Sequence, residues 1–207
     1  MKLSNKFYNG CWLAKRKISR YYYNIRNRMR LNATHVNYSK EIEMNGKIII
    51  SNCGEISIGK NVIINSGNYP NPVGTSLTRI YTQNSNSKIN IGNNVGMSST
   101  LLFADNEIRI DDDVLIGAET MIFDTDFHGL LYIGNSKRNN VEDGKPVHIK
   151  QGAFIGTKTV ILKGVEVGEG AVIGAGSVVT KDIPVYEIWA GNPAAFIRKV
   201  NMEKMDE

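Results

Sequence analysis

The chain has 207 residues, of which 42% are hydrophobic, and this size suits one compact core rather than two large domains. No stretch approaches the roughly 20 consecutive apolar residues that a membrane-spanning helix needs, and the apolar segment near the N-terminus is too short for a signal peptide. We therefore expect a single-domain protein of the cytoplasm.

The net charge of +5 is concentrated at the N-terminus, where residues 1–40 hold ten Lys and Arg and no acid. Aromatic residues, among them Phe7, Trp12 and Tyr21, are interleaved with these charges. We expect a basic, helical extension over 1–40. Its charge suits the inner face of an anionic membrane or an anionic substrate, and a merely solvated helix face is the alternative. Nucleic acid is disfavoured as a partner, because no recognised binding motif accompanies the charge.

The next segment, residues 41–189, is expected to form a repeat domain. Weak repeats surround Ile58 to Val62 and Ile91 to Val95, where an aliphatic residue is followed by glycine and two polar residues. Between them, residues 68–87 are rich in Asn, Pro, Ser and Thr, which predicts an irregular insertion.

A period of six residues appears at Ile110, Ile116 and Ile122 and then breaks over residues 124–146. It resumes at Val147. An interruption that returns to register predicts a loop projecting from the repeats, and loops of this length in compact domains are usually functional.

The period is clearest from Val147 to Asp182, where aliphatic residues lie six apart without a miss: Ile149, Ile155, Ile161, Val167, Ile173 and Val179. A helix would show spacings of three and four, and a single strand would show simple alternation. Three six-residue strands that complete one triangular coil would instead stack Ile149 on Val167, 18 residues away. The sequence thus predicts an all-β solenoid whose core is buried by stacking of successive coils.

The repeats end before residues 190–207. Asn192 is a favourable helix N-cap, and Pro193 suits the first turn of a helix. We therefore expect a short C-terminal helix followed by a tail.

The hexad run, the phrase from Val172 to Pro184 and the terminal Ala190-Gly191-Asn192-Pro193 together resemble the hexapeptide-repeat acyltransferases, and more narrowly the maltose and galactoside O-acetyltransferases. The resemblance implies a left-handed parallel β-helix that acetylates a sugar or glycan hydroxyl with acetyl-CoA as cosubstrate, for example in polysaccharide biosynthesis. It also implies a homotrimer with active sites between neighbouring subunits.

His128 matches the catalytic histidine of this family, at the point where the repeat breaks into the long loop. An acceptor hydroxyl has too high a pKa to ionise at neutral pH, and histidine is the usual base. Asp124 and Asp126 precede it and are candidates to orient the imidazole, to bind sugar hydroxyls or to cap the strand end. Ser98 and Ser99 lie where relatives often carry an asparagine that contacts the acceptor or the oxyanion.

The resemblance also carries a set of CoA-binding candidates over to Phe154, Gly156, Thr157, Gly174, Ala175, Thr180, Lys181 and Arg198. Small residues let a linear pantetheine lie close to the coils, while Lys181 and Arg198 suit phosphate groups. For the glycines, corner geometry is an equally good explanation.

Other functions fit the sequence less well. Cys11 and Cys53 lie far upstream of the matched site, which disfavours an acyl-cysteine intermediate. No metal is expected, because His35, His128 and His148 lack the spacing of the zinc ligands in hexapeptide-repeat carbonic anhydrases. Acetylation of an amino sugar or of a streptogramin-type antibiotic stays open, and so does a non-enzymatic scaffold, since the fold does not decide among them.

Overall fold

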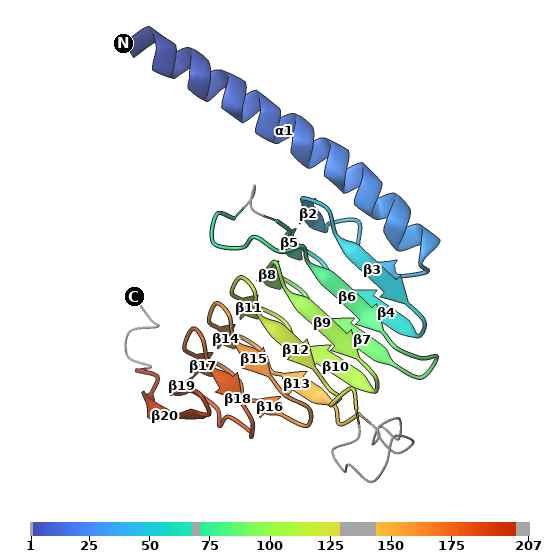
Figure 1. The fold of residues 1–207 in the computed structure, drawn as a ribbon, viewed down its shortest axis with the longest axis vertical. Coiled ribbons are helices and arrows are strands. Elements are labelled where there is room, and N and C mark those ends of the chain that lie inside the picture. The colour runs from blue at the N-terminus through green and yellow to red at the C-terminus, as the bar shows by residue number, and fades with distance from the viewer. Residues whose placement is uncertain (1, 68–70, 129–143, 202–207) are drawn as a thin grey trace.

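The computed structural model describes residues 2–67, 71–128 and 144–201, with side chains from residue 17 onward. Its strands coil into three parallel sheets that stack along one axis (Figure 1). Through most of the chain, each strand pairs with the strand three places later, so one coil gives one strand to each sheet. This confirms the predicted solenoid and has the repeating pattern of a left-handed β-helix.

Two of the sheets have six strands each. Sheet A contains β1 (Asn37–Tyr38), β4 (Glu55–Ile58), β7 (Lys88–Ile91), β10 (Glu107–Ile110), β13 (Val147–Ile149) and β16 (Glu166–Val167). Sheet C contains β3 (Ile49–Asn52), β6 (Arg79–Thr82), β9 (Leu101–Ala104), β12 (Met121–Phe123), β15 (Val160–Ile161) and β18 (Val178–Val179).

Sheet B is longer because the end of the chain adds a hairpin to it. Its strands are β2 (Glu43–Asn45), β5 (Ile63–Asn65), β8 (Gly96–Ser98), β11 (Leu115–Ile116), β14 (Phe154–Ile155), β17 (Val172–Ile173), β19 (Glu187–Gly191) and β20 (Ala194–Lys199). Only the pairing of β19 with β20 is antiparallel among these strands.

The core is built by the aliphatic residues of the six-residue period. All six hexad positions from Ile149 to Val179 have 0% exposure, and Ile149 pairs directly with Val167 as the spacing predicted. Alternate residues of a strand point outward, so a buried aliphatic residue at the same place in each strand accounts for the period.

Polar ladders support the corners that join the strands. Asn61, Asn94 and Asp113 occupy equivalent corners of successive coils, and each has a positive φ, of 54°, 57° and 61°. Asn and Asp tolerate this left-handed conformation better than other non-glycine residues do. The Asn61 amide donates to Asn94 Oδ1 at 3.1 Å, and the Asn94 amide donates to Asp113 Oδ1 at 2.9 Å, so the same residues also tie the coils together.

A single helix, α1 (Lys2–Ala33), forms most of the predicted basic extension. Its C-terminal part covers the first coil, and the rest continues beyond the solenoid (Figure 1). Leu31 is fully buried there, and Arg20 forms an ion pair with Glu43 of β2. In the part of the chain that the structure describes, no helix is long and apolar enough to cross a membrane.

Two expectations about irregular segments were wrong in part. Residues 187–199 form the β19–β20 hairpin instead of a C-terminal helix, because the last coil leaves an open sheet edge whose hydrogen-bonding groups the hairpin pairs. The insertion expected over 68–87 contains β6, so the irregular part is shorter. Residues 68–70 lie outside the described residues.

The interruption at 124–146 falls between β12 and β13, as predicted, and residues 129–143 of it lie outside the described residues.

Candidate active site

His128 follows β12 at the beginning of the long loop, and its side chain is exposed. The preceding residue, Phe127, anchors this segment. Its ring packs against Phe103 and Phe123, with centroid distances of 4.7 Å and 5.5 Å. Phe127 adopts a positive φ of 63°, a strained conformation for a bulky residue that the ring contacts help to hold. The structure thus fixes the backbone beside His128 while leaving the imidazole open to solvent.

The base of the loop is closed by Asp124, which is fully buried. Its two carboxylate oxygens accept the backbone N–H groups of Asp105 and Asn106, both at 2.7 Å, and its carbonyl accepts the N–H of Lys145 at 2.8 Å. Burial, reinforced by the nearby charge of Asp105, raises the pKa of the Asp124 carboxyl despite these hydrogen bonds. Because both oxygens bind backbone, a structural cap is the favoured one of its three candidate roles.

Asp126 has a different environment. Its carboxylate forms a 2.5 Å ion pair with Lys163 Nζ, in the coil that follows the loop. This pair holds the segment that leads to Phe127 and His128 from the other side, and it leaves Asp126 partly exposed.

Ser98 and Ser99 lie away from His128 within one chain. They are buried at the corner where sheet B leads into sheet C, whereas His128 follows the strands of sheet C at their opposite end. Ser98 Oγ accepts the Asn65 amide at 3.4 Å, and Ser99 Oγ has no hydrogen-bond partner among the described residues. The expected acceptor site is therefore not assembled from these residues in a single chain.

An open groove of about 250 Å³ runs along the outer face of sheet B beside Phe154, whose side chain is 46% exposed. Ile63, Leu115 and Ser98 also line it. An open, largely apolar groove fits a linear pantetheine arm. Arg198 lies on the same face, because the strand register continues from Phe154 through Val172 and Ile188 to Arg198.

Gly156, Thr157, Gly174 and Ala175 occupy the corners next to this face. A Cβ on Gly156 would lie 2.5 Å from the backbone nitrogen of Ala175, and one on Gly174 would lie 2.7 Å from Ala190 Cβ. The close stacking of coils therefore explains both glycines without a ligand.

Within one chain, Thr180 and Lys181 lie apart from the candidates Gly174 and Ala175. They follow β18, whereas Gly174 and Ala175 precede it, so the two groups lie at opposite ends of this strand. Lys181 Nζ is 5.1 Å from the centroid of the Trp189 ring, a cation–π distance.

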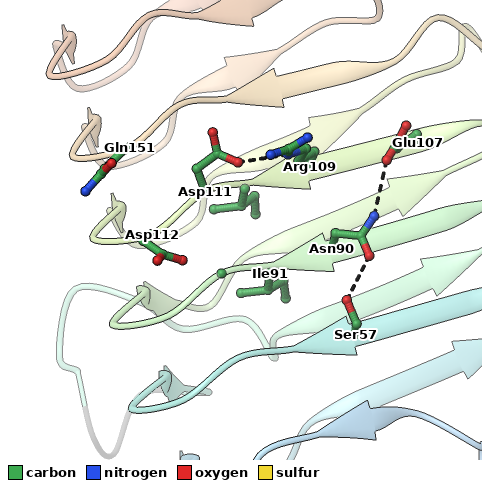
Figure 2. A pocket seen from close by; sticks show the side chains of 10 residues that line it. Ser57, Asn90, Ile91, Glu107, Arg109, Asp111, Asp112 and Gln151 are labelled. Atoms are coloured by element: carbon green, nitrogen blue, oxygen red, sulfur yellow. Dashed lines mark hydrogen bonds and ion pairs between the residues drawn. The ribbon is translucent and has the colours of Figure 1, made fainter.

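The outer face of sheet A carries a polar pocket of about 560 Å³ that the sequence did not reveal. Figure 2 shows Asp111 paired with Arg109, and Asn90 bridging Ser57 and Glu107. His148 Nε2 lies 2.8 Å from Asp111 Oδ2, so this histidine is engaged on sheet A, apart from the loop that carries His128. The described residues contain no cluster of three or more side chains arranged to bind a metal ion.

The row of Tyr81, Phe103 and Phe123 is the other feature that sequence reasoning missed. These residues are neighbours on sheet C, but they are separated by 22 and 20 positions in the sequence. A search for outward-facing aromatic residues at the same position of successive coils would have found them, although uneven coil lengths hide the spacing.

Comparison with known proteins agrees with the coil geometry. Residues 146–181 match the family model for the bacterial transferase hexapeptide (six repeats). The match is confined to this segment, which is the part of the chain where the six-residue period is clearest. The chain is 40% identical over 96 residues to a Schizosaccharomyces pombe protein described as an acetyltransferase. The match covers 46% of the chain and 45% of that relative, so the chain spans less than half of its length.

Solved structures share the same architecture. A maltose O-acetyltransferase from Clostridium difficile 630 is 27% identical, with a TM-score of 0.50, over 74% of this chain and 70% of that chain. AntD, an N-acyltransferase from Bacillus cereus in complex with dTDP and 3-hydroxybutyryl-CoA, is 22% identical, with a TM-score of 0.65, over 86% of this chain and 91% of that chain. At this identity the likeness to AntD shows the fold alone.

Proposed function

We propose that this hexapeptide-repeat protein transfers the acetyl group of acetyl-CoA to a hydroxyl of a sugar or glycan in the cytoplasm. The observation that carries the proposal is the exposed imidazole of His128 on a backbone segment fixed by Phe127 and Asp124. The match to the hexapeptide transferase repeat and the likeness to a maltose O-acetyltransferase support the choice of reaction.

In the proposed mechanism, neutral His128 accepts the proton of the acceptor hydroxyl while that oxygen forms a bond to the thioester carbonyl carbon. The tetrahedral oxyanion then collapses, the carbon–sulfur bond breaks, and the imidazolium returns its proton to the departing thiolate of CoA. The exposed position of His128 in the single chain leaves its imidazole accessible to an acceptor and to a neighbouring subunit.

For the cosubstrate, we propose that the groove beside Phe154 receives the pantetheine arm and that Arg198 binds a phosphate on the same face. The groove lies on sheet B, whose strands precede those of sheet C, whereas His128 follows the strands of sheet C. One chain therefore does not bring the groove and His128 together. A homotrimer in which the groove of one subunit faces His128 of its neighbour would complete the site, and this arrangement is part of the proposal.

The proposal is tested by incubating the purified chain with acetyl-CoA and a panel of sugars, nucleotide sugars and amino sugars, and measuring the free thiol of CoA. His128→Asn is compared with His35→Asn as a matched control, because His35 is exposed and has a positive φ of 53° that asparagine accepts. Acceptor-dependent release that persists in the control and is lost in His128→Asn is expected. Equal release by both variants would remove His128 from catalysis.

The same assay separates O-acetylation from N-acetylation of an amino sugar or an antibiotic. An O-acetyl ester product is cleaved by hydroxylamine at alkaline pH, whereas an amide product survives. Loss of the acetyl group from the isolated product is the expected result, and a hydroxylamine-resistant product would identify an N-acetyltransferase.

A further inference from the structure

Helix α1 contacts the solenoid through one face only. Asn27 is 3% exposed, and its amide donates to the carbonyl of Gly46 at 2.8 Å. One turn on, Leu31 is fully buried, and between them the Arg28 guanidinium donates to the carbonyl of Ile42 at 3.0 Å. These contacts fix the rotation of the helix about its axis.

The opposite face of α1 presents a continuous apolar stripe to solvent. With 3.6 residues per turn, its members fall within an arc of about 100°. This exposed stripe consists of Ile18 (70% exposed), Tyr21 (71%), Tyr22 (54%), Ile25 (45%) and Met29 (68%). In the sequence, apolar residues recur at the same spacing upstream, at Leu3, Phe7, Cys11 and Ala14.

The charge around the stripe has one sign. Residues 1–40 contain ten Lys and Arg and no Asp or Glu. Lys17 and Arg26 are exposed and lie on either side of the stripe in the helical register. An apolar face bordered by cations is the arrangement of helices that lie in the interface of a membrane, with apolar side chains below the headgroups and cations among them.

We propose that α1 docks this protein on an anionic phospholipid surface through the exposed stripe and its flanking cations. A second copy of the chain is a poorer occupant, because two such helices facing each other would bring like charges together with no acid on either helix to pair with them. Burial of the apolar stripe would supply the part of the binding free energy that does not depend on charge. Attraction between the cations and the anionic headgroups would supply the rest. Docking would place the β-helix beside the membrane and does not depend on the proposed acetyl transfer.

The test is sedimentation of the full chain with vesicles of phosphatidylcholine alone or of phosphatidylcholine with 30% phosphatidylglycerol. We expect strong binding to the anionic vesicles, weak binding to the neutral ones, and loss of binding as salt screens the charges. Ile18→Ser/Ile25→Ser should lower the partition coefficient at least tenfold, since serine and isoleucine have similar helix propensities and the change mainly removes apolar surface.

A matched control is Val73→Ser/Val185→Ser, which alters two side chains of the solenoid that are 58% and 55% exposed. It should bind vesicles like the parent chain. Lys17→Gln/Arg26→Gln should lower binding to anionic vesicles about 30-fold at low salt, with helix content checked by circular dichroism.

Equal binding to neutral and anionic vesicles would overturn the proposal, as would binding that the stripe variant leaves unchanged. A different result would be that the parent chain does not bind vesicles and forms an oligomer in analytical ultracentrifugation, while the stripe variant is monomeric. The stripe would then be covered by a second copy, and the proposal would be wrong.

Discussion

Replacing Gly156 by alanine tests whether glycine is required at this position by the close stacking of coils or by contact with a ligand. The N–H of Gly156 donates to the carbonyl of Ile173 at 2.8 Å, which fixes the spacing between the two coils. A Cβ at this position would lie 2.5 Å from the backbone nitrogen of Ala175 and 2.7 Å from the carbonyl carbon of Gly174, well inside van der Waals contact. The atoms that this Cβ would meet are all backbone atoms of the next coil, so no flexible side chain can move aside, and we expect destabilisation of about 2–3 kcal/mol.

Gly152→Ala is the matched control, because it adds the same methyl group at a glycine that is not closely packed. Gly152 has a positive φ of 68°, and a Cβ added there would meet nothing within 4 Å, so alanine adds only the cost of the left-handed conformation, about 1 kcal/mol. Urea unfolding followed by circular dichroism measures both as shifts of the midpoint at constant m-value. A cost for Gly156→Ala no greater than that for Gly152→Ala would refute the packing argument. Unchanged stability together with a raised KM for acetyl-CoA would assign Gly156 to the cosubstrate instead.

Three further perturbations follow from the site. Phe127→Ala should lower kcat by about tenfold to a hundredfold with little change in KM, because loss of the ring contacts frees the backbone beside His128. Phe127→Tyr keeps the ring and should retain activity. An equal loss of kcat in both variants would contradict this positioning role. Asp124→Asn should cost about 1–3 kcal/mol in urea unfolding at neutral pH, since an amide offers one acceptor to two buried N–H groups, and an unchanged midpoint would show that the loop base does not depend on this cap. Glu119 accepts the N–H groups of Ser76 and Thr75, which lower the pKa of its carboxyl below the ordinary value for glutamate. The stability that this carboxylate contributes should therefore be lost as the pH falls through that lowered pKa. Glu119→Gln should flatten this part of the profile of midpoint against pH, and identical profiles would exclude the effect.

The sequence determined the interior of this protein because the signal is local and repeated. Each hexad places one aliphatic residue inward, and six such residues in register from Ile149 to Val179 leave one way to bury them all. The break before Val147 predicted an interruption between two strands for the same reason, and β12 and β13 lie on either side of it. The place of His128 just after β12 could be predicted from the same break in the period.

The outer surfaces depended on tertiary structure, because the length of each coil decides which residues become neighbours. Phe103 and Phe123 flank Phe127 only because β9 and β12 stack, and Phe154 shares a face with Arg198 only through three strand pairings. The end of the chain shows the same limit. Asn192-Pro193 has good local signals for a helix, but the open edge of sheet B offered backbone hydrogen bonds that no helix would have paired, so the hairpin formed.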